Sequence, residues 1–162
     1  MYKVAIITAS DKGYAGERED KSGSVIEEIV TAHELEVTGK VILPDDRQML
    51  SDQMLNYCHQ GIDLILTTGG TGFSKRDVTP EATADIVERR ADNLTFAMIA
   101  NSLQYTPKAM LSRGIAGIRE NTLIVNLPGS PKAVRENLEY AIDAIIHGVK
   151  IFKGDDAECA RK

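Results

Sequence analysis

Short apolar runs alternate along this chain with segments in which apolar residues recur every three or four positions. The apolar runs have the length of strands, and uninterrupted runs are typical of strands buried on both faces of a sheet. We expect strands at residues 4–9, 36–43, 63–68, 115–119 and 122–127. The last two flank Glu120-Asn121, which favours the turn of a β-hairpin.

The segments with helical spacing lie between these runs. They predict helices at residues 22–34, at a segment marked by Leu50, Met54, Leu55 and Cys58, and at residues 80–89, 94–104 and 131–149. Residues 10–20 are polar and contain two glycines, which predicts a loop. We expect residues 153–162 to form a loose tail.

The alternation of strands with helices predicts an α/β fold with three layers, in which helices cover both faces of a mostly parallel sheet. The hairpin gives this sheet a mixed edge. A length of 162 residues is sufficient for one core, so we expect a single domain over residues 1–162.

Composition and charge narrow the class of function. The chain has 19 Lys and Arg against 24 Asp and Glu, so it lacks the basic surplus of a general nucleic-acid binder. We find no signal peptide and no apolar stretch long enough to span a membrane. Cys58 and Cys159 have no CxxC spacing, which favours a reducing compartment. We therefore expect a cytoplasmic protein that binds neither membranes nor nucleic acids.

Three loops that follow predicted strands carry the candidate chemistry, because ligands of open α/β sheets bind beyond the carboxyl ends of the strands. The most unusual loop spans residues 67–83. Its three glycines, within residues 69–72, let the backbone approach a ligand and present N–H groups to it. Thr79-Pro80 then predicts a capped helix start and an anion site. The spacing fits neither a Rossmann fingerprint nor a P-loop, and for the glycines alone a tight turn is the simpler interpretation.

The second loop, residues 126–133, repeats this pattern with a glycine followed by Ser130-Pro131. Together, the two loops would suit a ligand with phosphates at both ends, although a capped helix start is the simpler interpretation of the second alone. The third loop contains Asp45 and Asp46. Either carboxylate can bind Mg²⁺ or cap the next helix, and we expect one to cap while the other faces the site.

Residues 68–83 resemble the signature of the MogA/MoaB family, which is also seen in the G domain of gephyrin. The similarity continues through residues 109–113 and 126–131, and residues 10–11 and 20–23 also fit. It covers nearly the whole chain. The resemblance implies the fold of that family and its activity, in which AMP passes from ATP to the phosphate of molybdopterin and pyrophosphate is released.

The same resemblance assigns site residues. The two functional aspartates of the family fall on Asp45 and Asp77, either of which is a candidate ligand for Mg²⁺. The substrate-binding positions fall on Thr8, Ser10, Asp11, Thr68, Gly69, Gly70, Thr71, Gly72, Ser112, Arg113, Pro128, Gly129, Ser130 and Pro131.

Cofactors and partners also follow from the resemblance. It implies ATP as co-substrate, Mg²⁺ as cofactor, and a homo-oligomer, most often a trimer, that passes its product to the molybdate-insertion enzyme. The predicted helix 94–104 is apolar on more than one face, through Phe96, Met98 and Ile99, which suits an interface as well as a core. The alternatives are a catalytically silent molybdopterin-binding paralogue and an interaction module.

The expected reaction joins two anions, so it requires positioning and charge neutralisation more than a strong general base. Backbone N–H groups of the glycine loops and Mg²⁺ can supply this neutralisation. Four cations lie on or beside the loops and can assist, with ordinary solvated charges as the alternative interpretation: Lys75, Arg76, Arg113 and Lys132.

Overall fold

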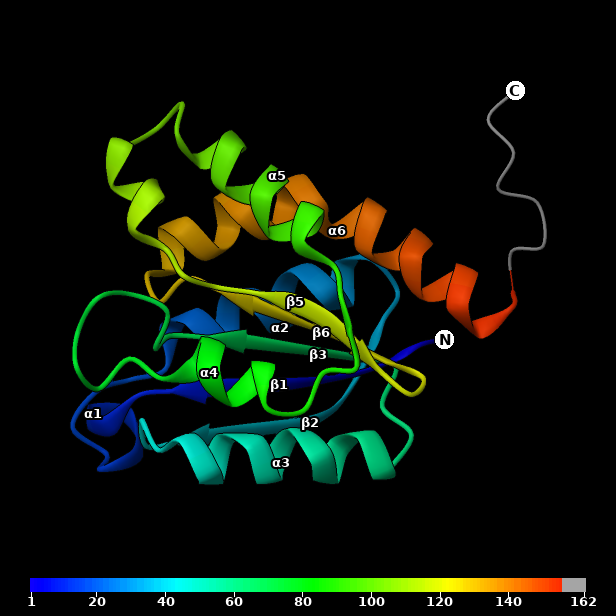
Figure 1. The fold of residues 1–162 in the computed structure, drawn as a ribbon, viewed down its shortest axis with the longest axis horizontal. Helices are drawn as coiled ribbons and strands as arrows, with labels where there is room; N and C mark the ends of the chain where they lie inside the picture. The colour runs from blue at the N-terminus through cyan, green and yellow to red at the C-terminus, as the bar shows by residue number, and fades with distance from the viewer. Residues whose placement is uncertain (156–162) are drawn as a thin grey trace.

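The computed structural model describes residues 1–155 and shows a six-stranded sheet in the order β2-β1-β3-β6-β5-β4 (Figure 1). Four strands run parallel: β1 (Lys3–Ala9), β2 (Glu36–Leu43), β3 (Leu64–Thr68) and β6 (Thr122–Leu127). The mixed edge consists of β5 (Ala116–Arg119), antiparallel to β6, and the two-residue strand β4 (Arg89–Arg90). The predicted fold class and hairpin are confirmed.

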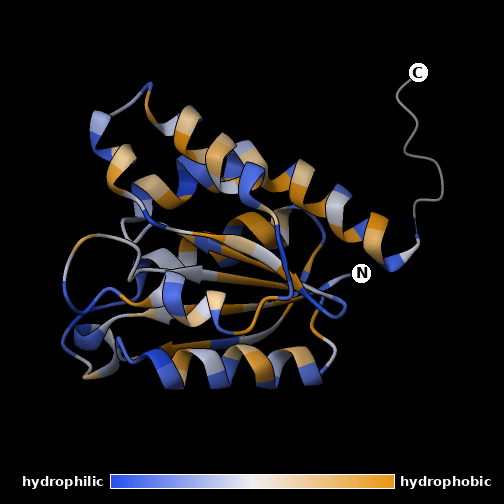
Figure 2. Cartoon of the chain, viewed as in Figure 1, coloured by the Kyte–Doolittle hydropathy of each residue, from blue (hydrophilic) through white to orange (hydrophobic). Residues whose placement is uncertain are grey.

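Helices cover both faces of the sheet, because the side chains of the central strands alternate between the faces. Val4 and Ile6 of β1 belong to the apolar cluster beneath three helices: α2 (Lys21–Ala32), α5 (Asp92–Ser102) and α6 (Pro131–Lys153). Ala5 and Ile7 belong to the opposite cluster, beneath α3 (Arg47–His59) and α4 (Thr79–Ala84). Figure 2 shows the central strands as largely hydrophobic and the helices as a mixture of hydrophobic and hydrophilic residues.

Several elements differ from the sequence prediction. Helix α4 ends at Ala84, and the predicted extension to residue 89 is wrong, because the Glu88 N–H donates to the Ile118 carbonyl at 2.9 Å and the chain joins the sheet as β4. Residues 10–20 are not wholly a loop. They contain the single-turn helix α1 (Asp11–Tyr14), in which Ser10 accepts a hydrogen bond from the Gly13 N–H. The 3₁₀ helix η1 (Pro107–Leu111) was not predicted.

Helix α6 continues past the predicted end at residue 149. Its last residue, Lys153, pairs with the buried Asp63 at 2.5 Å, and Asp155 accepts a hydrogen bond from the Tyr2 hydroxyl at 2.6 Å. The start of the predicted tail is therefore anchored, and its remainder, residues 156–162, lies outside the described residues. The single domain over residues 1–162 stays a prediction. None of the described helices is long and apolar enough to cross a membrane.

The carboxyl ends of the four parallel strands lie along one edge of the sheet. In Figure 1 these ends point to the left, toward α1 and the long loop that joins β3 to α4. The three loops selected from the sequence therefore leave the sheet on the same side, as parallel strands require.

Candidate active site

Two adjoining hollows open at the carboxyl ends of the parallel strands. The first has a volume of about 760 Å³ and is lined by the loops that follow β1, β2, β3 and β6. The second, of about 420 Å³, lies among the β3 loop, η1 and the start of α6. Gly70, Asp77 and Gly129 line both hollows. We refer to these three residues as the shared rim.

The first hollow gathers predicted residues from four segments of the chain. Beyond the shared rim, these are Thr8, Ser10, Asp45, Thr68, Gly69, Ser130 and Pro131. Residues 18–22 line it as well, and the sequence analysis did not select them as site residues. They include Arg18 and Lys21, the cations of this lining. Residues 20–23 match the family signature, which could have identified Lys21, whereas no sequence signal marks Arg18.

The second hollow is lined by more apolar side chains. The predicted residues Thr71, Gly72, Ser112 and Pro128 contribute to it. Its remaining lining was not predicted as site residues, although Ala109 and Leu111 lie in the segment that resembles the family and Ala133 ends the second loop. These residues are Ile99, Ser102, Thr106, Lys108, Ala109, Leu111, Ala133, Glu136 and Asn137.

Asp45 and Asp46 have separate roles, as predicted. Asp46 caps α3, since its Oδ1 accepts a hydrogen bond from the Met49 N–H at 2.8 Å. Asp45 faces the first hollow. Its Oδ2 accepts from the Asp11 N–H at 3.2 Å, and its own N–H donates to Asp11 Oδ1 at 3.0 Å. Asp45 Oδ1 is buried and has no partner among the described residues. This burial raises the pKa of the Asp45 carboxyl.

Arg76 joins the β3 loop to the loop that follows β1. Its guanidinium donates to both carboxylate oxygens of Asp11, at 3.0 and 2.9 Å. This bidentate contact lowers the pKa of the Asp11 carboxyl. Because Asp11 also bonds to Asp45, the loops after β1, β2 and β3 are held together. Asp11 itself is outside the lining of both hollows, so it supports the site and does not face it.

The first two glycines of the β3 loop occupy conformations that favour glycine. Gly69 has φ +87° and Gly70 has φ +67°. A Cβ on Gly69 would lie 2.3 Å from the Ala9 carbonyl oxygen, and a Cβ on Gly70 would lie 2.3 Å from Thr79 Oγ1. Farther along the loop, Asp77 Oδ2 accepts a hydrogen bond from the Ser74 N–H at 3.0 Å, which orients this carboxylate beside the rim.

The two predicted helix starts are not equivalent. Ser130 caps α6, accepting from the Ala133 N–H at 3.1 Å, and lines the first hollow. Thr79 is not a cap. Val78 holds that position without a side-chain bond, and Thr79 is completely buried in the first turn of the six-residue helix α4. The Thr79 N–H donates to the Gly70 carbonyl at 3.1 Å, and neither Thr79 nor Pro80 lines either hollow, so the structure does not support the anion site predicted at Thr79-Pro80.

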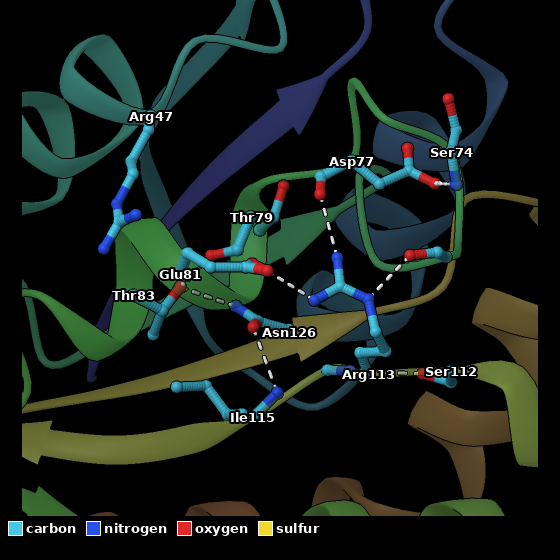
Figure 3. A network of polar contacts seen from close by, with 12 residues as sticks. Arg47, Ser74, Asp77, Thr79, Glu81, Thr83, Ser112, Arg113, Ile115 and Asn126 are labelled. Atoms are coloured by element: carbon cyan, nitrogen blue, oxygen red, sulfur yellow. Dashed lines mark hydrogen bonds and ion pairs between the residues drawn. The ribbon is translucent and has the colours of Figure 1, made fainter.

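Arg113 is also placed differently from the prediction. It lies outside the lining of both hollows, and its guanidinium contacts Gly72, Asp77 and Glu81 (Figure 3). It therefore acts on the β3 loop and not on a ligand in either hollow. Lys132 lines a separate surface hollow with Tyr105 and Tyr140, away from the shared rim. Lys75 is exposed on the β3 loop.

The carboxylates of Asp45 and Asp77 suit a cation that is shared with a phosphorylated ligand. Among residues 1–155 no group of three or more His, Cys, Asp or Glu side chains could hold a metal without other ligands. Asp45 and Asp77 nevertheless both line the first hollow, and Asp45 Oδ1 is a buried oxygen without a partner. Mg²⁺ is commonly bound by one or two carboxylates together with substrate phosphates, so these residues fit that ion.

Comparison with known proteins identifies the family. A model described as a probable molybdopterin binding domain matches residues 5–147. The chain belongs to the MogA/MoaB family. MoaB from Thermus thermophilus superposes with a TM-score of 0.90 at 42% identity, covering 95% of this chain and 98% of that structure. A tungsten cofactor synthesizing MoaB from Pyrococcus furiosus superposes with a TM-score of 0.85 at 34% identity, covering 93% and 96%.

Sequence relatives in the MogA/MoaB family include both short and long proteins. The molybdopterin adenylyltransferase of Helicobacter pylori strain J99 is 38% identical over 94% of this chain and 88% of its own length. Gephyrin of Dictyostelium discoideum is 42% identical over 92% of this chain, which spans only 22% of gephyrin. The matched region is therefore most of the bacterial protein and a small part of the gephyrin chain.

Proposed function

We propose that this MogA/MoaB protein is a molybdopterin adenylyltransferase, which transfers AMP from ATP to the phosphate of molybdopterin. The observation that carries this proposal is the shared rim. Two hollows, of about 760 and 420 Å³, meet at Gly70, Asp77 and Gly129, so two substrates can lie side by side with their reacting phosphates at one place. The name of the Helicobacter relative, molybdopterin adenylyltransferase, supports the same activity.

The reaction requires close approach of two anions. An oxygen of the molybdopterin phosphate attacks the α-phosphorus of ATP, forming a phosphoanhydride bond while the bond from that phosphorus to the β-phosphate bridging oxygen breaks. Pyrophosphate carries away the electron pair. Since the attacking phosphate is already ionised at neutral pH, no strong general base is needed. The protein must instead position the groups and compensate their charge.

The first hollow has the groups for charge compensation. The N-terminus of α6 opens into it at Ser130 and Pro131, where the helix dipole favours an anion. Arg18, before α2, and Lys21, at its start, can contact phosphates directly, although Glu19 and Asp20 beside them offset their charge. Asp45 and Asp77 would repel phosphates directly, so we propose that they hold Mg²⁺ jointly with the nucleotide. The ion would neutralise phosphate charge during transfer.

The activity is tested by incubating the purified protein with molybdopterin, ATP and Mg²⁺ and analysing the products by mass spectrometry. We expect an AMP adduct of molybdopterin and one pyrophosphate per adduct. A parallel reaction in EDTA should give no adduct, while molybdopterin binding measured by titration persists. Binding without any adduct would identify a silent carrier and overturn the proposal, and full transfer in EDTA would remove the role of Mg²⁺.

We also propose that the protein is a trimer. Several large apolar side chains on α5, η1 and the segment between them are exposed, including Phe96 at 70%, Met110 at 64% and Tyr105 at 57%, and an interface would cover them. Met98 is buried in the core, so the proposed interface would use Phe96 and not Met98 of this helix. A monomer mass from light scattering at micromolar concentration would contradict this proposal.

The adenylylated product would then pass to a separate molybdate-insertion enzyme. We propose the cytoplasm as the compartment, because ATP is available there and the buried Cys58 is a free thiol.

A further inference from the structure

Arg113 contacts the β3 loop at both ends of its exposed part. Its Nε donates to the Gly72 carbonyl at 2.8 Å, and one terminal nitrogen donates to the Asp77 carbonyl at 2.8 Å. The other terminal nitrogen pairs with Glu81 of α4, as Figure 3 shows. The Arg113 backbone N–H also donates to the Thr71 carbonyl at 2.8 Å. One residue thus fixes the beginning of the loop, its end and the helix that follows.

The part of the loop between these contacts is not fixed by the core. Residues 73–76 are all exposed, and the Phe73 side chain is 70% exposed. Within this part, Ser74 and Asp77 bond to each other, because the Ser74 N–H donates to Asp77 Oδ2 and the Asp77 N–H donates to the Ser74 carbonyl, both at 3.0 Å. Arg76 contacts Asp11 from this part, so the position of the Asp77 carboxylate depends on that contact and on how the two ends of the loop are held.

The location of Arg113 also connects the two hollows. Its neighbour Ser112 lines the second hollow. Arg113 binds the carbonyls of Gly72, which also lines the second hollow, and of Asp77, which belongs to the shared rim. Arg113 thus joins the wall of the second hollow to the backbone of Asp77 at the shared rim. A displacement of about 1 Å at a reacting site can reduce the rate about 100-fold.

We propose that Arg113 is a positioning residue for adenylyl transfer, which holds Asp77 at the shared rim without contacting either substrate. This inference rests on the proposed function. The guanidinium is suited to the role because its planar fork can donate in three directions at once, to two carbonyls and a carboxylate. A lysine at this position would keep the charge and lose the fork, so charge and geometry can be separated by one substitution.

The first test compares R113K with R135K. Arg135 is a matched control, because it also bridges carboxylates, Glu28 and Glu139, with 39% of its side chain exposed against 34% for Arg113. We expect R113K to lower kcat about 10- to 100-fold, with KM for ATP and molybdopterin changing less than about 3-fold. R135K should behave like wild type. Unchanged kcat with a raised KM in R113K would indicate a substrate contact and overturn the proposal.

The second test asks whether Arg113 acts through Asp77. If it does, adding R113K to D77N should reduce kcat by less than about 3-fold, because the group that Arg113 positions is already removed. Multiplicative losses would contradict the inference. If R113K does not fold, E81Q provides the same comparison, because it weakens the ion pair of Arg113 and leaves Gly72 and Asp77 unchanged; a kcat equal to that of wild type would then overturn the proposal.

A third measurement does not depend on catalysis. We expect hydrogen exchange at the Ser74 and Asp77 amides to be at least about 10-fold faster in R113K than in wild type, with exchange in the central strands unchanged. Equal exchange at these two amides would refute the positioning role. If wild type itself formed no AMP adduct, the proposed function would fail, and the exchange experiment would still test whether Arg113 fixes the loop.

Discussion

The two loops that supply the shared rim begin alike and end differently. Each leaves a parallel strand through glycine and enters a helix at Ser or Thr followed by Pro. After β6, Gly129 leads directly to Ser130, which caps a 23-residue helix and faces the first hollow. After β3, an exposed segment follows the glycines, and Thr79 is buried inside a six-residue helix with its hydroxyl unbonded among the described residues.

This difference shows how loop length determines what holds a loop in place. The short β6 loop is fixed along its length, since its Pro128 and Gly129 carbonyls each accept a hydroxyl at 2.6 Å, from Thr68 and Ser22, which lie 60 and 107 residues away in sequence. The longer β3 loop is fixed at both ends of its exposed part by Arg113, and within that part by the contact of Arg76 with Asp11. We therefore expect the β6 loop to be a stable anion site and the β3 loop, which has a longer exposed part, to carry the position-sensitive chemistry.

The largest effect should come from Asp77 in the β3 loop. We expect D77N to lower kcat by about 100-fold or more, the scale of losing one key electrostatic group. Folding should be retained, because an asparagine oxygen can still accept the Ser74 N–H. Steady-state kinetics and thermal unfolding of the purified variant check both statements. Turnover equal to that of wild type would show that the β3 loop is only structural and would remove the contrast between the loops.

The glycines of the two loops should differ in the stability they contribute. We expect G70A to lower the free energy of unfolding by about 2–3 kcal/mol, because alanine at φ +67° is strained and its Cβ would meet Thr79 Oγ1 at 2.3 Å. We expect G129A to stay within about 0.5 kcal/mol of wild type, since its Cβ would lie 3.4 Å from Gly69 Cα, an ordinary contact. Urea unfolding measures both. Equal losses would mean that the two glycine turns are equally constrained.

Most of the fold could be predicted from the sequence, because hydrophobic periodicity reports directly on which face of an element is buried. The parallel strands and the hairpin are examples. The extent of α4 could not be predicted, since Ile86 and Val87 continue a helical pattern while pairing of Glu88 with β5 draws the chain into the sheet. A local pattern contains no information on such a competing partner.

The candidate site could be predicted less completely. The Ser-Pro pattern marks the start of α6 because the Ser130 cap is a local contact, and the capping preference of aspartate predicts that one of Asp45 and Asp46 caps α3 without identifying which. Thr79-Pro80 has the same local pattern as Ser130-Pro131, yet its burial depends on tertiary packing. The sequence shows Arg113 as a cation near a family motif but not the direction of its guanidinium.

A smaller effect is expected at the cap of the β6 loop. S130A should lower the free energy of unfolding by about 1 kcal/mol, because the Ala133 N–H at the start of α6 loses its acceptor. The kcat for adenylyl transfer should fall less than in D77N, since the backbone N–H groups at the start of α6 remain. Chemical denaturation and kinetics on the same preparation compare the two losses. A fall in kcat as large as that of D77N would place the main charge compensation in the β6 loop instead.

The smallest effect should come from Thr79, the residue that matches Ser130 in pattern but not in position. A buried hydroxyl without a partner costs about 1–3 kcal/mol, and valine replaces it with a methyl group of similar size. We therefore expect T79V to unfold at the same denaturant concentration as wild type or a higher one. T122V is the matched control, because the buried Thr122 hydroxyl donates to the Ile62 carbonyl at 2.6 Å, far from the hollows, and its removal should cost about 1 kcal/mol. If T79V were destabilised as much as S130A, Thr79 would be supporting its helix after all, and the two loops would differ in length alone.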